Sequence, residues 1–146
     1  MQFALKDSER IPPSPNLRAL CPACEQEVRS RCGSVNIWHW SHVTLSDCPG
    51  TKEETAWHRG WKMFFPEEYR ERVVKNELGC VIADVLLPDG MALEFDYKNQ
   101  LTKEGVERKN AIFEKSGIKP IWIFFVDRLP EYAFERSSHG DSYWFK

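Results

Sequence analysis

At 146 residues, the chain suits one compact domain with a small appendage and is too short for two full domains. Its hydrophobic content of 42% is enough for a packed core, while its net charge of −2 excludes a molecule covered in positive charge, so contact with nucleic acid requires a local patch. No apolar run approaches membrane-spanning length, and residues 1–5 lack the features of a secretory signal, so we expect a cytoplasmic protein without a membrane partner.

The first predicted feature along the chain is a structural zinc site. A proline-rich loop at residues 11–15 leads into Cys21-Pro22-Ala23-Cys24, a turn that carries two thiols. Without a secretion signal, such a Cys-x-x-Cys pair indicates a metal site more than a disulfide. Zinc in a structural site takes four tetrahedral ligands, so two more must follow in the sequence.

Two histidines and a later cysteine are the candidates for these places. The strand-like residues 35–40 return the chain toward the turn, and His42 is the best third ligand. The fourth is either His39, which gives a Cys₂His₂ site, or Cys48, which gives a Cys₃His site. We expect bound zinc to fold the N-terminal quarter of the chain. The alternative is a set of reduced structural thiols beside two surface histidines.

Residues 53–69 predict the first helix, which Pro66 ends or kinks near Phe65. Its polar residues recur at a spacing of four, which places them on one face, beside a second face rich in tryptophan. The polar stripe consists of Glu54, His58 and Lys62. A stripe of acid, imidazole and ammonium groups fits a catalytic site, and a plain solvated helix surface is the alternative.

A strand at residues 72–77 is followed by a β-hairpin, in which runs 81–87 and 91–97 flank the turn residues Pro88-Asp89-Gly90. Both runs carry acidic residues where a plain core strand would not. Asp84 interrupts the first run. In the second, period-two alternation places three polar residues on one face: Glu94, Asp96 and Lys98. If the two runs pair, Asp84 lies near Glu94.

Carboxylates clustered on strands are the ligands that Mg²⁺ or Mn²⁺ prefers, usually one or two together with water and substrate phosphate oxygens. Such an ion can polarise a phosphodiester bond. The pattern of Asp, spacer and Glu-x-polar is that of the PD-(D/E)XK nucleases. The alternative is an edge strand with one solvent-facing polar side.

Residues 103–116 predict a second helix closed by Gly117, and residues 120–126 are continuously apolar, which predicts a central strand buried on both faces. The remaining residues are polar with scattered aromatics. This order of elements predicts a mixed α/β (α+β) fold, with a small sheet whose strands run in both senses.

Taken together, the motifs resemble the competence-protein CoiA-like nuclease family over residues 21–127. Each short motif is weak alone, but their order and spacing match the family's pattern. The matching segments are Cys21-Pro22-Ala23-Cys24, His39-Trp40-Ser41-His42 with Cys48, residues 54–62, Ile82-Ala83-Asp84-Val85, Glu94-Phe95, Glu107-Arg108 and Pro120-Ile121-Trp122-Ile123.

The resemblance implies a zinc-ribbon-like segment at residues 1–50, a restriction-endonuclease-like core at 51–127 and a C-terminal tail at 128–146. It also implies a structural zinc ion and a catalytic Mg²⁺ or Mn²⁺ ion. The implied roles are metal binding by Asp84 and Glu94, a further metal or catalytic role for Glu54, water orientation or charge compensation by His58 or Lys62, and phosphate binding by Lys62 and Arg108.

One position departs from the family's pattern. Asp96 stands where the family has Gln and the wider superfamily has Lys. Asp96 is either a third acidic metal ligand, or a sign that Lys98 or Lys62 supplies the catalytic cation. A third reading is that catalysis is weakened or lost while nucleic-acid binding remains.

The implied function is metal-dependent hydrolysis of DNA, single- or double-stranded. The alternative is a catalytically inactive domain of the same fold that binds nucleic acid or a protein partner. A homodimer is a further option, because many nucleases of this fold dimerise to cut both strands.

Overall fold

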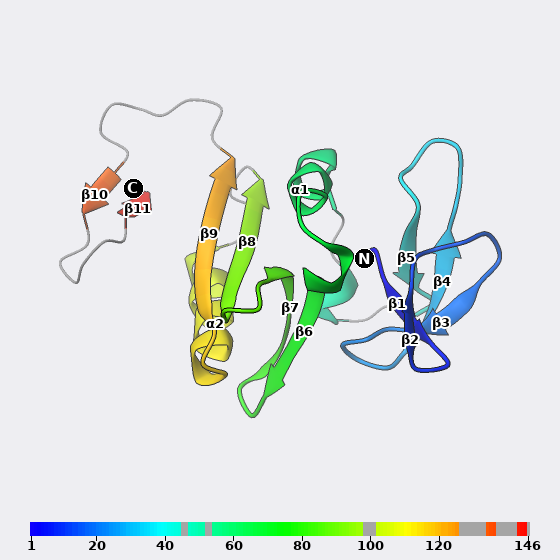
Figure 1. The fold of residues 1–146 in the computed structure, drawn as a ribbon, viewed down its shortest axis with the longest axis horizontal. Coiled ribbons are helices and arrows are strands. Elements are labelled where there is room, and N and C mark those ends of the chain that lie inside the picture. Colours follow the sequence, from blue (N-terminus) through cyan, green and yellow to red (C-terminus); the bar gives the residue numbers. More distant parts are fainter. Residues whose placement is uncertain (45–46, 52–53, 98–101, 126–133, 137–142, 146) are drawn as a thin grey trace.

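The computed structural model describes residues 1–44, 47–51, 54–97, 102–125, 134–136 and 143–145, and of the last two segments only the backbone. The described chain is a mixed α+β structure with an N-terminal sheet, a central sheet and two α-helices (Figure 1). This confirms the predicted fold class. In the described part of the chain, no helix has the length and apolar character needed to cross a bilayer.

The N-terminal sheet is antiparallel and has the strand order β2-β1-β3-β4-β5. Its strands are β1 (Ala4–Lys6), β2 (Glu9–Ile11), β3 (Arg18–Leu20), β4 (Glu27–Arg31) and β5 (His39–His42). The inner face of this sheet packs around the buried Trp40 and Val28 together with Cys21 and Cys48. The cysteines predicted to bind zinc are therefore part of the core of this sheet.

The central sheet has the order β6-β7-β8-β9, and its strands run in both senses as predicted. The first two pairs are antiparallel and β8 pairs with β9 in parallel. The strands are β6 (Arg70–Asn76), β7 (Gly79–Leu86), β8 (Met91–Tyr97) and β9 (Lys119–Phe125). A separate two-stranded sheet joins β10 (Phe134–Arg136) to β11 (Tyr143–Phe145).

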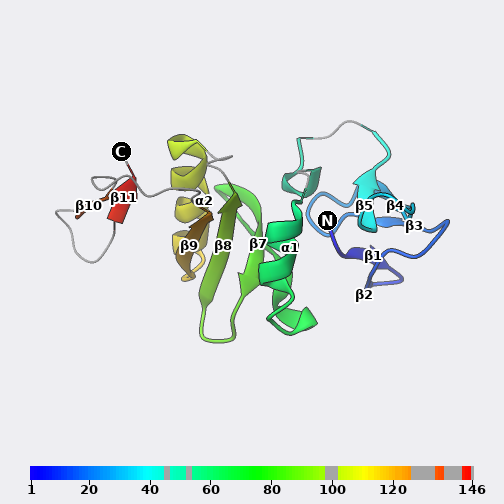
Figure 2. The same cartoon turned by 90° about the horizontal axis from the view of Figure 1, so that it is seen from above.

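The two helices, α1 (Ala56–Lys62) and α2 (Lys103–Lys115), pack against opposite faces of the central sheet (Figures 1 and 2). Trp57 and Trp61 of α1 contact the ring of Phe95. Ile112 and Phe113 of α2 are buried in a cluster that includes Ala92. Phe95 and Ala92 differ by three positions on β8, so their side chains point to opposite faces.

The predicted first helix at residues 53–69 is too long. Helix α1 starts after Thr55, whose side chain accepts a hydrogen bond from the backbone N–H of His58 and caps the helix. It ends at Lys62 because a proline at position 66 cannot donate to the carbonyl of residue 62 and its ring would clash there. Phe65 N–H donates to that carbonyl instead, and the short 3₁₀ helix Glu67–Tyr69 (η2) follows Pro66.

The prediction of a central, doubly buried last strand is also wrong. Strand β9 lies at the end of the sheet order, and its apolar side chains are only partly buried. Helices cover each of its faces in part, which explains the unbroken apolar run. Phe125 contacts Trp57 of α1, while the Trp122 indole donates a hydrogen bond to Asn110 of α2.

Candidate active site and metal cluster

Four predicted zinc ligands converge at the edge of the N-terminal sheet. The ligand atoms of Cys21, Cys24, His42 and Cys48 all lie within 4.8 Å of one another. The Cys21 and Cys48 sulfurs are 3.6 Å apart, and the Cys24 sulfur is 3.2 Å from His42 Nε2. Zinc–sulfur bonds of about 2.3 Å in a tetrahedron give sulfur–sulfur edges of about 3.8 Å, so the cluster is compatible with a structural zinc site.

The fourth place in this cluster belongs to Cys48 and not to His39. Because side chains alternate along a strand, Trp40 and His42 of β5 face the core while His39 faces the other side. His39 Nδ1 instead forms a hydrogen bond with the carbonyl of Ile37, 2.8 Å away. The short helix Pro49–Thr51 (η1) follows Cys48, and the N–H of Gly50 donates to the Cys48 sulfur at 3.4 Å.

The chemistry of the donors also suits zinc. Burial raises the pKa of the Cys21 thiol, and it raises the pKa of the Cys48 thiol to about 12. A bound zinc ion reverses this preference because a coordinating thiol loses its proton. His42 Nδ1 is buried, and among the described residues it has no hydrogen-bond partner. Its Nε2 lies 3.2 Å from the Cys24 sulfur, and this contact orients the His42 imidazole toward the cluster.

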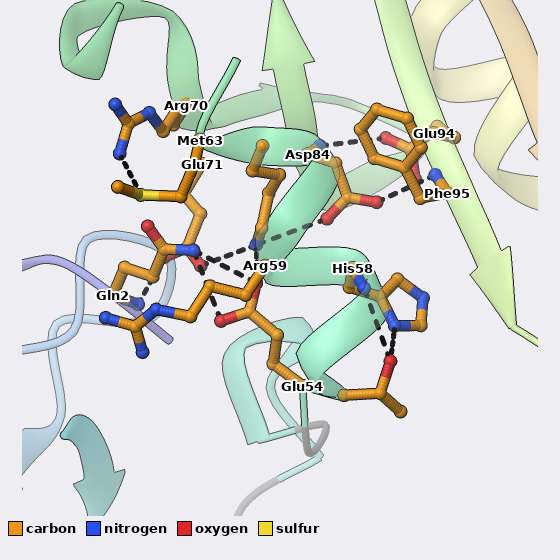
Figure 3. Close-up of polar contacts among 12 residues, drawn as sticks. Gln2, Glu54, His58, Arg59, Met63, Arg70, Glu71, Asp84, Glu94 and Phe95 are labelled. Carbon is orange, nitrogen blue, oxygen red and sulfur yellow. Dashed lines mark hydrogen bonds and ion pairs between the residues drawn. The ribbon is translucent and has the colours of Figure 1, made fainter. Parts of the chain in front are cut away.

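A second group of predicted residues meets where strands β7 and β8 separate. The two strands pair at Val85–Leu93 and Leu86–Ala92, next to their turn. Beyond these pairs, side chains replace the backbone ladder: Asp84 Oδ2 accepts from the N–H of Phe95 at 2.9 Å, and Glu94 Oε1 accepts from the N–H of Asp84 at 3.3 Å (Figure 3). The predicted proximity of Asp84 and Glu94 is confirmed.

Lys62 lies at the centre of this site. Its ammonium group contacts Glu54, lies 2.9 Å from Glu71 Oε1 and lies 3.5 Å from Asp84 Oδ1. Its side chain is only 4% exposed. Burial alone would lower the pKa of Lys62, but the charges of Glu71, Asp84 and Glu54 outweigh it and raise the pKa. The raised pKa favours the positively charged form of Lys62.

The sequence patterns missed Glu71 and Gln2, which complete the surroundings of Lys62. Glu71 has a positive φ of 45°. Its two neighbours on β6 pair with β7, as Arg70–Val85 and Arg72–Ala83, and Glu71 lies between these two pairs. Gln2 donates from its backbone N–H to Glu71 at 2.7 Å and from its side chain to both oxygens of Glu54 (Figure 3). The segment before β1 thus reaches into the site, and no local motif signals either Glu71 or Gln2.

The sequence patterns also missed Lys109 of α2, which forms an ion pair with Glu94. Glu94 is almost fully buried, and Asp96 on the same face of β8 is 3% exposed. Burial raises the pKa of Glu94 to about 7, even though the charge of Lys109 opposes the shift. Burial would lower the pKa of Lys109, but the charges of Glu94 and Asp84 outweigh it and raise the pKa.

These residues line one cavity of about 540 Å³, and its lining comes from the N-terminal segment, α1, the central sheet and Lys109 of α2. Its described lining contains five carboxylates, two lysine ammonium groups and Met1, whose α-amino charge also acts on Glu71, so negative charge is in excess. The carboxylates are Glu54, Glu71, Asp84, Glu94 and Asp96, and the ammonium groups are Lys62 and Lys109. Carboxylate oxygens are the ligands that a hard divalent cation prefers.

The other predicted site residues are placed as follows. His58 lines the cavity, and its Nδ1 lies 2.7 Å from the Thr55 hydroxyl oxygen. Arg108 does not line the cavity described here, because its guanidinium lies beside Gly79, at the β6–β7 turn. Lys98 falls outside the described residues.

Comparison with known families supports the resemblance for the N-terminal segment. Residues 17–51 match the model described as competence protein CoiA, N-terminal domain. This segment contains β3, β4 and β5 and all four residues of the Cys/His cluster. No curated protein and no solved structure matches the chain. The likeness to CoiA therefore concerns the part of the chain that carries the Cys/His cluster.

The metal cluster yields a first prediction. Replacing Cys48 with Ala is expected to abolish binding of one equivalent of zinc and to unfold the N-terminal sheet, because Cys48 contributes both a ligand and core packing. Replacing His39 with Ala leaves zinc content unchanged, because His39 faces away from the cluster. Elemental analysis of the purified variants with thermal melting measures both effects. Retention of zinc by Cys48→Ala together with its loss in His39→Ala would contradict this assignment.

The ion pairs of the buried Lys62 with its three surrounding carboxylates yield a second prediction. Lys62→Met keeps the length of the side chain but leaves the buried Glu71 without its cation, which we expect to lower the free energy of unfolding by about 3–5 kcal/mol. Lys103→Met on α2 is the matched control, because that side chain is 76% exposed, and its effect should stay within about 0.5 kcal/mol. Urea unfolding measures both. Equal stabilities of the two variants would refute a structural role for the buried ammonium.

Proposed function

We propose that the protein is a metal-dependent nuclease that hydrolyses DNA phosphodiester bonds. The observation that carries the proposal is the pairing of Asp84 and Glu94 where β7 and β8 separate, inside a cavity that also holds the buried Lys62. The likeness of residues 17–51 to competence protein CoiA supports a competence-related role. The arrangement of a mixed sheet with one helix on each face is consistent with a restriction-endonuclease-like core.

Asp84 and Glu94 are the residues that would hold Mg²⁺ or Mn²⁺. Their carboxylate oxygens suit a hard cation, and the negative excess of the cavity lining favours its entry. When bound, the ion supplies a Lewis acid for the phosphate and lowers the pKa of water. Asp96 lies on the same face of β8 and lines the same cavity, so we propose it as a candidate third acidic ligand.

The remaining cavity residues have distinct proposed roles. Glu54 contacts Lys62 and accepts hydrogen bonds from Gln2, which favours a positioning role over direct metal binding. Lys62 holds Asp84 in place through the ion pair at 3.5 Å. His58 lies at the cavity wall with its Nδ1 held by Thr55, so the other side of the imidazole can orient water or a phosphate oxygen.

One observation favours the alternative of a non-catalytic domain that binds nucleic acid or a protein partner. Asp96 is a buried acid at the position where a catalytic cation stands in the related motif. A domain that lacks this cation would retain its fold and its affinity for a partner, but it would no longer cleave DNA at a useful rate. The alternative therefore predicts binding without cleavage.

Cleavage of labelled single- and double-stranded DNA in Mg²⁺ or Mn²⁺ tests the proposal. We expect metal-dependent cleavage by the zinc-loaded wild type, and a loss of about 10²–10³-fold or more in Asp84→Asn and in Glu94→Gln, because each removes a ligand of the ion that stabilises the charge on the reacting phosphate. Glu114→Gln is the matched control, because that exposed acid on α2 lies outside the cavity lining.

Two results would oppose the proposal. Cleavage that persists in both variants would show that the activity does not depend on this cavity. Binding of DNA by folded wild type without any cleavage would favour the non-catalytic alternative.

A further inference from the structure

Besides the divalent ion, the proposed reaction gains from a protein cation that can reach the substrate, and the residues of β8, Met91–Tyr97, supply none. On the face of β8 that carries Glu94, the next residue is Asp96, and both are almost completely buried. A phosphodiester brings a further negative charge to a cavity whose lining already has excess carboxylate. A protein cation beside the divalent ion adds to the compensation of the transition-state charge.

Lys62 is poorly suited to this task. An ammonium group has three N–H donors, and three carboxylates surround the Lys62 nitrogen. Its side chain is 4% exposed, and the groups that hold it are themselves anchored by Gln2. Moving Lys62 toward a substrate would leave the buried Glu71 uncompensated, which is costly.

Lys109 is placed differently. It projects from α2 between Val106 and Phe113, which are buried and fix that face of the helix against the sheet. Its ammonium contacts Glu94 at the cavity wall and lies 5.6 Å from the centre of the Trp122 ring. The Lys109 side chain is 20% exposed, whereas Glu94 is 1% exposed. The Lys109 side chain is therefore less enclosed than that of Lys62, which is 4% exposed.

We propose that Lys109 is the catalytic cation of this site and contacts the scissile phosphate, in the place where related motifs carry a lysine on the strand. This inference rests on the proposed nuclease function. Helix α2 supplies the cation because the strand position is occupied by Asp96. The ion pair with Glu94 holds the ammonium beside the metal-binding carboxylates, and its long flexible stem allows it to turn toward a phosphate oxygen.

The competing explanation is that Lys109 only neutralises the buried Glu94. The two explanations differ once the ion is bound, because the ion itself then compensates Glu94. A neutralising lysine becomes dispensable at saturating metal, whereas a lysine that contacts the phosphate is still needed for the chemical step. The affinity for Mn²⁺ and the single-turnover rate at saturating Mn²⁺ therefore separate the two roles.

The test compares Lys109→Met and Lys109→Arg with Lys103→Met, a control on the exposed side of α2. Calorimetric titration measures Mn²⁺ binding, and single-turnover cleavage of labelled DNA at saturating Mn²⁺ measures the chemical step. We expect Lys109→Met to bind Mn²⁺ at least as tightly as wild type but to cleave about 10²–10³-fold more slowly. Lys109→Arg should recover a large part of the rate, since it keeps the positive charge, and Lys103→Met should match wild type.

Three outcomes would overturn the inference. If Lys109→Met cleaves at the wild-type rate at saturating Mn²⁺, Lys109 only neutralises Glu94, and the proposed nuclease function stands. If Lys109→Met fails to fold, Lys109→Arg becomes the decisive variant, because it keeps the ion pair with Glu94. Cleavage by Lys109→Arg that is no faster than cleavage by Glu94→Gln would show that catalysis does not depend on a positive charge at position 109. If wild type binds Mn²⁺ but cleaves no DNA, the nuclease function and the inference fail together.

Discussion

The structure depends on one buried cation. Lys62 of α1 is surrounded by three carboxylates that come from the segment before α1, from β6 and from β7, and Gln2 of the N-terminal segment holds two of them. A buried ion pair persists only when its partners are held in good geometry, because each charge has lost its water. The same contacts therefore join the N-terminal sheet, α1 and the central sheet around one cavity, and they hold Asp84 beside Glu94.

The first two residues of the chain link the Cys/His cluster to the carboxylate cavity. Met1 packs in the core of the N-terminal sheet, where its carbonyl accepts from the N–H of Trp40 and its sulfur lies 3.9 Å from the Cys21 sulfur. The next residue, Gln2, is bonded to Glu54 and Glu71. The N-terminal part of the chain, which carries the Cys/His cluster, thus forms one wall of the carboxylate cavity. This contact gives a physical reason for the N-terminal sheet and the central sheet to occur in one chain.

Local patterns predicted the features that depend on spacing along the chain. The Cys-x-x-Cys turn, the position of His42 and the proximity of Asp84 to Glu94 follow from turns and period-two alternation. Lys109 and Glu71 could not be predicted this way, because their roles depend on how α2 and β6 pack. Gln2 and Glu71 are 69 positions apart in sequence. The sequence predicted that Pro66 ends or kinks α1, but it placed this end near Phe65. The helix ends earlier, at Lys62, because a proline affects the carbonyl four residues before it.

The central claim is that Asp84 and Glu94 hold a divalent ion at the separation of β7 and β8. A crystal structure of the zinc-loaded protein grown in Mn²⁺, with anomalous scattering recorded at the manganese edge, tests this claim most directly. We predict an anomalous peak within bonding distance of an oxygen of each of these two carboxylates, with Lys62 still bound to Glu71. Clear density for both carboxylates without a manganese peak between them, at a concentration that saturates any binding seen in solution, would contradict the claim.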